Sequence, residues 1–232
     1  MRETEETDEG VKWFYADFLP RMKTARSVRI EDGILPRLRE QDIHLFTPWG
    51  PRYSWEIRGA IICENDKEVE TLRFLHTVLD EISGHMPGKS IRWIVLGADL
   101  YGTRLNGLPE EAISDYFASL SDWLATFLPE VEFRLWSEFD EIAEPYREQV
   151  RANFSQFVRP ELLLRAAQTA QTMGRGSDPR GYLTERLAEA LLIENLLKPI
   201  KVSCVMRHKD DHVDADLPRL YIVPGNLTAP WM

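Results

Sequence analysis

Residues 90–102 read SIRWIVLGADLYG, and this stretch decides the fold. Its apolar run, rich in β-branched and aromatic residues, is typical of a buried strand that ends where Gly-Ala-Asp begins at position 97. Helical patterns precede it over 68–82 and follow it over 109–127, so we expect a β-α-β-α alternation with this strand near the middle of a parallel sheet. Open sheets of this kind bind ligands at the carboxyl ends of their strands, which places a candidate site just after residue 97.

Other segments continue the same alternation. The patterns predict further strands at 42–46, 131–136, 200–206 and 220–223, and further helices at 11–18, 139–158, 161–173 and 182–197. The helix that precedes residue 90 is predicted to extend over 67–83. Residues 57–63 fit either an edge strand or a strap over the site. The order predicts an α/β fold, a Rossmann-like and mostly parallel sheet with flanking helices and a helical insertion in the C-terminal half.

Composition and the positions of helix-breaking and strand-breaking residues predict the domain organisation. Residues 1–10 are acidic without an apolar core, which predicts a disordered tip and argues against a secretory signal. We expect residues 11–232 to form a single domain, in which 138–197 is a helical subdomain and the chain returns to the sheet at 199–206. The sequence GRGSDP at 174–179 is typical of a flexible break.

Net charge and cysteine content argue against several kinds of partner and site. The chain has 28 Lys and Arg against 38 Asp and Glu, a formal charge of −10, which disfavours non-specific attraction to nucleic acid or anionic lipid. We therefore expect no nucleic-acid partner. No apolar run is long enough to span a membrane, so we expect no membrane partner. Without a secretory signal, the expected location is the cytoplasm. Two cysteines without a CxxC pair give no support to a zinc ribbon, a redox motif or a disulfide framework. The oligomeric state does not follow from the sequence.

The loop TPWGPRYSW at 47–55 concentrates residues suited to ligand contact. Its arginine, Arg52, carries a planar fork that fits a phosphate or a carboxylate, although a solvated loop arginine is an equal alternative. Aromatic residues of this loop and of the segment after the strand that ends at residue 97 would either line the site of an apolar substrate or cap the core. The predicted substrate-binding residues are Arg52, Tyr53, Trp49, Tyr101, Arg104 and Lys201. For Arg104 and Lys201 an ordinary surface cation is the alternative.

Three residues at strand ends are the catalytic candidates. Asp99 is placed to orient an amine or to act as a base, and a turn acid is its equal alternative. Arg207 and His208 would supply a cation and a group that titrates near neutral pH, unless they belong to a hairpin loop. His208 and His212, with nearby aspartates, are of metal-ligand type, but loop spacing does not impose the convergent geometry of a metal site. We therefore predict no metal site and no cofactor.

Several short motifs together resemble the isocyanide synthase family, also described as the pyoverdine/dityrosine biosynthesis family. The loop at 45–55 is similar to the family's Pro-Gly-Phe-Pro-x-Lys-Ser-Pro-Asn segment, and Gly97-Ala98-Asp99-Leu100-Tyr101 stands where the family has Ser-Asp-Gly-Arg-Val-Phe. The similarity covers about two thirds of the chain. Further matching segments are 64–70, Pro87-Gly88, 107–111 with Tyr116, 200–203 and 228–231.

The resemblance implies a Rossmann-like core and an enzyme that converts the amino group of an amino acid to an isonitrile with a pentulose phosphate. It therefore implies an amino-acid substrate and an anionic co-substrate, a sugar phosphate. Several polar positions of the family pattern are changed: Arg52 or Tyr53 replaces the loop lysine, and Val205 replaces a strand-end histidine. These departures keep open the alternative of a non-catalytic small-molecule-binding module on the same fold.

Overall fold

The computed structural model describes residues 9–21, 29–50, 67–105, 107–172, 178–203 and 217–222, and the structural statements below refer to these ranges. Arg52, Tyr53, Arg207 and His208 lie outside them, as do the segment 57–63, the His212 region and residues 174–177. Predictions that rest on those residues therefore remain predictions.

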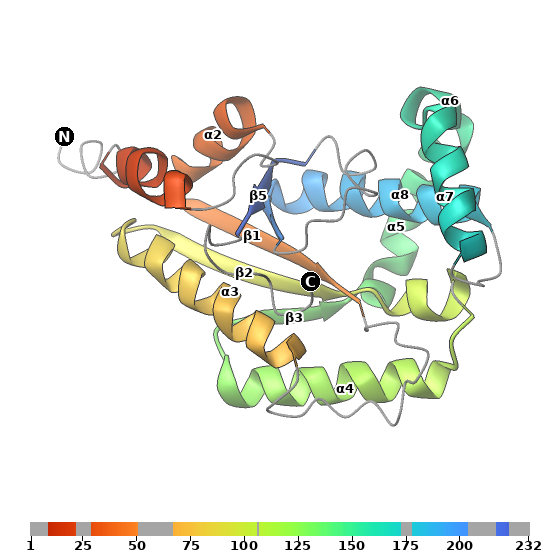
Figure 1. The fold of residues 1–232 in the computed structure, drawn as a ribbon, viewed down its shortest axis with the longest axis horizontal. Helices are drawn as coiled ribbons and strands as arrows, with labels where there is room; N and C mark the ends of the chain where they lie inside the picture. Colours follow the sequence, from red (N-terminus) through yellow and green to blue (C-terminus); the bar gives the residue numbers. More distant parts are fainter. Residues whose placement is uncertain are drawn as a thin grey trace.

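A five-stranded parallel sheet forms the centre of the molecule (Figure 1). Its strand order is β3-β2-β1-β4-β5, and every neighbouring pair is parallel. The strands are β1 (Asp42–Trp49), β2 (Ser90–Gly97), β3 (Glu132–Leu135), β4 (Ile200–Ser203) and β5 (Arg219–Tyr221). This arrangement confirms the predicted Rossmann-like α/β class, and the order reverses between β1 and β4, where such sheets bind ligands.

Strand β2 lies inside the sheet, as its apolar sequence predicts. It pairs with β1 from Ser90 to Gly97 and with β3 on its other side. Val95 is fully buried because both faces of the sheet are covered. At Gly97 an added Cβ would lie 2.8 Å from the ring of Phe117, so the close approach of the following helix requires a glycine here.

Helices cover both faces of the sheet (Figure 1). Helices α3 (Lys67–Gly84) and α4 (Glu110–Phe127) pack on one face and form the larger core with residues 43, 45, 93 and 95 of the strands. On the other face, α5 (Asp140–Ala152) and α8 (Pro179–Leu197) pack with Phe46 and Leu96 in a second cluster. The period-2 alternation of β1 thus divides its side chains between two cores.

The helical insertion lies between β3 and β4, as the sequence predicts. It consists of η6 (Trp136–Phe139), α5, α6 (Phe154–Phe157), α7 (Pro160–Thr172) and α8. The single helix predicted for 139–158 is in fact two, because the chain turns at Asn153, whose side-chain amide donates to the carbonyl oxygen of Gln149 at 3.0 Å. Trp136, predicted as strand, begins η6 and is fully buried.

The N-terminal segment docks on the larger core. Residues 9–13 are helical and continue through η1 (Phe14–Phe18) and η2 (Leu19–Arg21), and Phe14 and Phe18 are fully buried there. After η4 (Ile30–Ile34), the short helix α2 (Leu35–Leu38) leads into β1. Among the described helices, none has both the length and the apolar character needed to span a bilayer.

Candidate functional site

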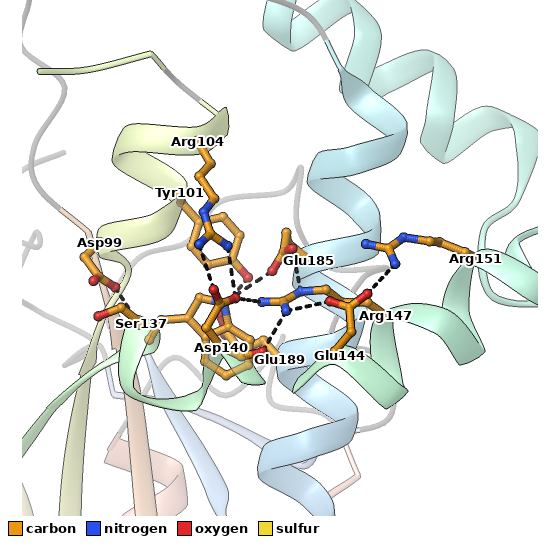
Figure 2. A network of polar contacts seen from close by, with 11 residues as sticks. Asp99, Tyr101, Arg104, Ser137, Asp140, Glu144, Arg147, Arg151, Glu185 and Glu189 are labelled. Carbon is orange, nitrogen blue, oxygen red and sulfur yellow. Dashed lines mark hydrogen bonds and ion pairs between the residues drawn. The ribbon is translucent and has the colours of Figure 1, made fainter. Parts of the chain in front are cut away.

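A network of polar side chains lies beside the carboxyl ends of β2 and β3, where α5 and α8 pack against each other (Figure 2). The segment after β2 supplies Asp99, Tyr101 and Arg104, the start of the insertion supplies Asp140, and α8 supplies Glu185 and Glu189. These elements meet because the carboxyl ends of parallel strands share one edge of the sheet and the two helices cover the adjoining face. The site is therefore built from three separate parts of the chain.

Tyr101 and Glu189 form the most deeply buried pair of the network. The Tyr101 hydroxyl donates to Glu189 Oε2 at 2.7 Å, and the two residues are 4% and 3% exposed. Burial raises the pKa of Tyr101 well above its ordinary value, and the negative charge of Glu189 raises it further. Tyr101 therefore keeps its proton at neutral pH and acts as a hydrogen-bond donor rather than as a base.

Arg186 accompanies this pair from the same helix. Its Nη1 lies 3.5 Å from Glu189 Oε1, and its guanidinium carbon lies 5.7 Å from the centre of the Tyr101 ring. A buried carboxylate needs a nearby cation or several hydrogen-bond donors to remain ionised. Arg186 and Tyr101 together meet that need for Glu189.

Arg147 organises the carboxylates of the insertion. This side chain of α5 is 4% exposed, and its guanidinium contacts Glu185 Oε1 at 2.7 Å, Asp140 Oδ1 at 2.5 Å and Glu144 Oε2 at 3.0 Å. Burial acts to lower the pKa of Arg147, but hydrogen bonds and charges from these three acids outweigh it and raise the pKa above its ordinary value. The arginine thus fixes Glu185 on the face of α8 that also carries Glu189, four residues on.

Arg104 joins the segment after β2 to the insertion. Its two terminal nitrogens contact the two oxygens of Asp140 at 3.0 and 2.7 Å, in a bidentate pair. The hydrogen bond from Arg104 is the main cause of a lowered pKa at Asp140. Figure 2 shows Asp140 between Arg104 and Arg147, so the acid is shared by two guanidinium groups.

Asp99 occupies the position predicted for it, at the carboxyl end of β2. Its Oδ1 accepts the backbone N–H of Ser137 at 3.0 Å, which ties the end of β2 to the turn that follows β3. This contact matches the alternative interpretation of Asp99 as a turn acid. Its catalytic role stays a prediction.

Trp49 and Tyr101, predicted to line one aromatic wall, lie in different cores. Trp49 packs against the larger cluster, and its indole nitrogen donates to the hydroxyl of Tyr116 on α4 at 2.9 Å. Tyr101 belongs to the second cluster, on the α5 and α8 face. The structure therefore separates these two candidates, and Trp49 has the core-capping position that was the alternative.

Lys201 is a buried residue rather than a surface cation. It is 5% exposed on β4, and it pairs in register with Phe46 of β1 and Arg219 of β5. Register partners in a sheet point to the same face. Lys201 and Arg219 therefore face the side of the sheet that carries Phe46, Tyr101 and α8.

Sequence reasoning missed most of the network. Arg147, Asp140, Glu185 and Glu189 were not among the predicted site residues. One usable signal is Glu189, an acid within the apolar sequence LAEALLI of α8, where a charged residue is rarely buried without a partner. The described residues contain no group of three or more His, Cys, Asp or Glu side chains arranged to hold a metal ion.

Comparison with known proteins adds a likeness of fold. Neither a protein-family model nor a curated protein matches the sequence. Among solved structures, a tyrosyl-tRNA synthetase from Archaeoglobus fulgidus complexed with L-tyrosine matches 92% of this chain with a TM-score of 0.56 and 16% identity. The chain spans 59% of the length of that synthetase.

Two further solved structures match the chain to different extents. The PvcA protein from Pseudomonas aeruginosa matches 94% of this chain and 83% of its own length, with a TM-score of 0.55 and 15% identity. A cyclodipeptide synthase from Candidatus Glomeribacter gigasporarum, bound to Phe-tRNAPhe, matches 82% of this chain and 90% of its own, with a TM-score of 0.37 and 13% identity. The TM-scores of the synthetase and of PvcA, 0.56 and 0.55, show a shared Rossmann-like fold. The expectation of no nucleic-acid partner is not confirmed, and one structural neighbour is a tyrosyl-tRNA synthetase.

Proposed function

We propose that this protein is a small-molecule biosynthetic enzyme that binds an amino acid, or a substrate derived from one, at the carboxyl edge of its sheet. In this proposal the substrate's ammonium group binds at Glu189 and Tyr101. The observation that carries the proposal is the buried Tyr101–Glu189 hydrogen bond, 2.7 Å long, beside the ends of β2 and β3. A buried acid that has to be held by a phenol and by Arg186, 3.5 Å away, is costly to maintain for stability alone, and such groups concentrate at functional sites.

The chemistry of the pair suits an ammonium ion. An ammonium group has three donors and no acceptor, so it seeks a carboxylate and a neutral oxygen. Glu189 offers the carboxylate, and Tyr101, whose raised pKa keeps it neutral, offers a phenol oxygen that also accepts. An ammonium group that binds there exchanges its own hydration water for charge-assisted hydrogen bonds to the protein, and such bonds are stronger than those between neutral groups.

The fold likeness and the sequence motifs support this proposal from separate directions. One structural neighbour is complexed with L-tyrosine, and another is the PvcA protein from Pseudomonas aeruginosa. The motifs at 45–55, 97–101 and 200–203 resemble the isocyanide synthase family. We therefore propose the reaction class of that family, the conversion of an amine to an isonitrile with an anionic sugar-phosphate co-substrate.

Calorimetric titration tests the ammonium site. L-Tyrosine and its deaminated analogue, 3-(4-hydroxyphenyl)propionate, are the first probes, followed by a screen of the remaining amino acids. We expect an amino acid to bind and its deaminated analogue to bind at least about tenfold more weakly, the loss of a charge-assisted hydrogen bond. Glu189→Gln should remove that preference, whereas Glu148→Gln, at an exposed acid of α5, should leave it unchanged.

Turnover distinguishes an enzyme from the alternative of a non-catalytic binding module. The departures from the family's polar motif positions favour that alternative. Mass spectrometry of an incubation with the selected amino acid and a pentulose phosphate would detect an isonitrile product. Binding without product would establish the binding module, and no preference for the amino group in any amino acid would overturn the proposed function.

A further inference from the structure

Arg104 is held at the carboxyl edge of the sheet by a contact that is easy to exchange. Its guanidinium makes the bidentate pair with Asp140, yet the Arg104 side chain is 55% exposed. Water reaches the Arg104 partner of this pair and competes with Asp140, which is 28% exposed, for the guanidinium. The arginine is therefore available to another anion of the same shape.

Asp140 does not depend on Arg104 for its compensating charge. The buried guanidinium of Arg147 contacts Asp140 Oδ1 at 2.5 Å and also donates to the Asp140 backbone carbonyl oxygen at 2.8 Å. Arg147 is in turn held by Glu144 and Glu185. If Arg104 turned away, Asp140 would still be paired, so the exchange leaves no uncompensated buried charge.

The position of Arg104 fits a ligand at the proposed site. It lies on η5 (Tyr101–Leu105), the segment that also carries Tyr101 and follows the carboxyl end of β2. Figure 2 shows Arg104 and Tyr101 on the same turn, whereas Arg151 lies at the opposite end of the network. A guanidinium fork matches the two oxygens of a carboxylate or a phosphate.

We propose that Arg104 binds the oxyanion group of the substrate or co-substrate, a carboxylate or a phosphate, and that Asp140 occupies this arginine until the oxyanion displaces it. The inference deepens the proposed function and rests on it for the location of the ligand. It also makes a prediction that a structural ion pair does not make: weakening Asp140 as a competitor strengthens anion binding.

Titration of inorganic phosphate and of acetate, as probes of the two oxyanion types, tests this exchange. Asp140→Asn keeps an oxygen for Arg147 but removes the competing charge, and it should raise the affinity for at least one probe about twofold to fivefold, the range of an exposed ion pair. Arg104→Gln should lower that affinity at least about tenfold, alone and combined with Asp140→Asn. A gain for phosphate alone assigns a phosphate ester, and a gain for acetate alone assigns a carboxylate.

Glu148→Gln is the matched control. Glu148 is an exposed acid of the same helix, α5, and this substitution removes one negative charge while leaving the three acids that contact Arg147 in place. This variant should leave both affinities unchanged. Equal binding of both probes by the wild type, Asp140→Asn and Arg104→Gln, including no measurable binding by any of them, overturns the exchange. That outcome would leave the ammonium test intact, because the test at Glu189 uses the amino group alone.

Discussion

The hydroxyl of Tyr101 donates to Glu189 across 88 residues of sequence, and this bond ties the segment after β2 to the middle of α8. Both residues are almost fully buried, so the bond joins the sheet edge to the helical insertion at a point that solvent scarcely reaches. In the proposed function, the ammonium group of the substrate reaches Glu189 between these two elements. The pair is at once a tertiary contact and the centre of the proposed site.

We predict that Tyr101 and Glu189 are energetically coupled. Tyr101→Phe leaves a buried carboxylate with one donor fewer and should lower the free energy of unfolding by about 1 to 3 kcal/mol. When Tyr101→Phe is made in the Glu189→Gln variant, the loss of unfolding free energy should be smaller, because the uncharged amide of Gln needs less compensation. The difference between the two losses is the coupling energy. Urea denaturation of the wild type, the two single variants and the double variant measures this coupling energy. Additive effects of the two substitutions would contradict a direct interaction.

We predict that Val95→Ala lowers the free energy of unfolding by about 1 to 3 kcal/mol, through lost burial and the cavity left behind. Val95 is fully buried on β2, which has a neighbouring strand on each side. Urea denaturation would measure the loss. A change of only a few tenths of a kcal/mol would show that β2 does not have the central place assigned to it here.

The sequence predicts the sheet well because its signals are local. The apolar run of β2 and the helical pattern over 68–82 each follow from a short window of sequence, and the structure confirms both elements and their order. The single helix predicted for 139–158 is wrong because the break depends on Asn153, whose side chain bonds to the backbone of the preceding helix. That competition does not alter the hydrophobic period.

The candidate site is harder to predict because its contacts are not local. The spacing of Tyr101 and Glu189 carries no motif, and Arg147 gathers acids from two helices only after α5 and α8 pack together. Lys201 shows the same limit. A lysine in the sequence is most often a surface cation, and only the position of β4 between β1 and β5 places Lys201 in the interior.

We predict that acid removes the contribution of Asp140 to stability. The pKa of this carboxyl is lowered from 3.8, first by the hydrogen bond from Arg104 and also by Arg147. The unfolded chain therefore takes up the proton at a higher pH than the folded protein does, and acidification favours unfolding. The contribution is complete above the unfolded value and is lost as the pH falls through the lower folded value.

The measurement is the difference in unfolding free energy between the wild type and Asp140→Asn as a function of pH. We expect about 1 to 2 kcal/mol at pH about 7, little change down to about 5, and a steady decrease below about 4. Glu148→Gln controls for the loss of one negative charge from the same helix. A difference that stays constant through the acid range would show that the ionised form of Asp140 has no preferred partner in the folded protein.

The last prediction separates the proposed site from the other face of the sheet. Tyr116→Phe removes the hydroxyl that accepts from the Trp49 indole at 2.9 Å, and it should lower the free energy of unfolding by about 0.5 to 1.5 kcal/mol. Trp49 and Tyr116 belong to the core under α3 and α4, whereas Tyr101 and Glu189 lie on the α5 and α8 side. Amino-acid affinity should therefore be unchanged in Tyr116→Phe while Glu189→Gln abolishes the preference for the amino group. Calorimetry on both variants, each matched for folded fraction, checks this. Equal losses of affinity would place the ligand against Trp49 instead, and would return that residue to the binding role first expected for it.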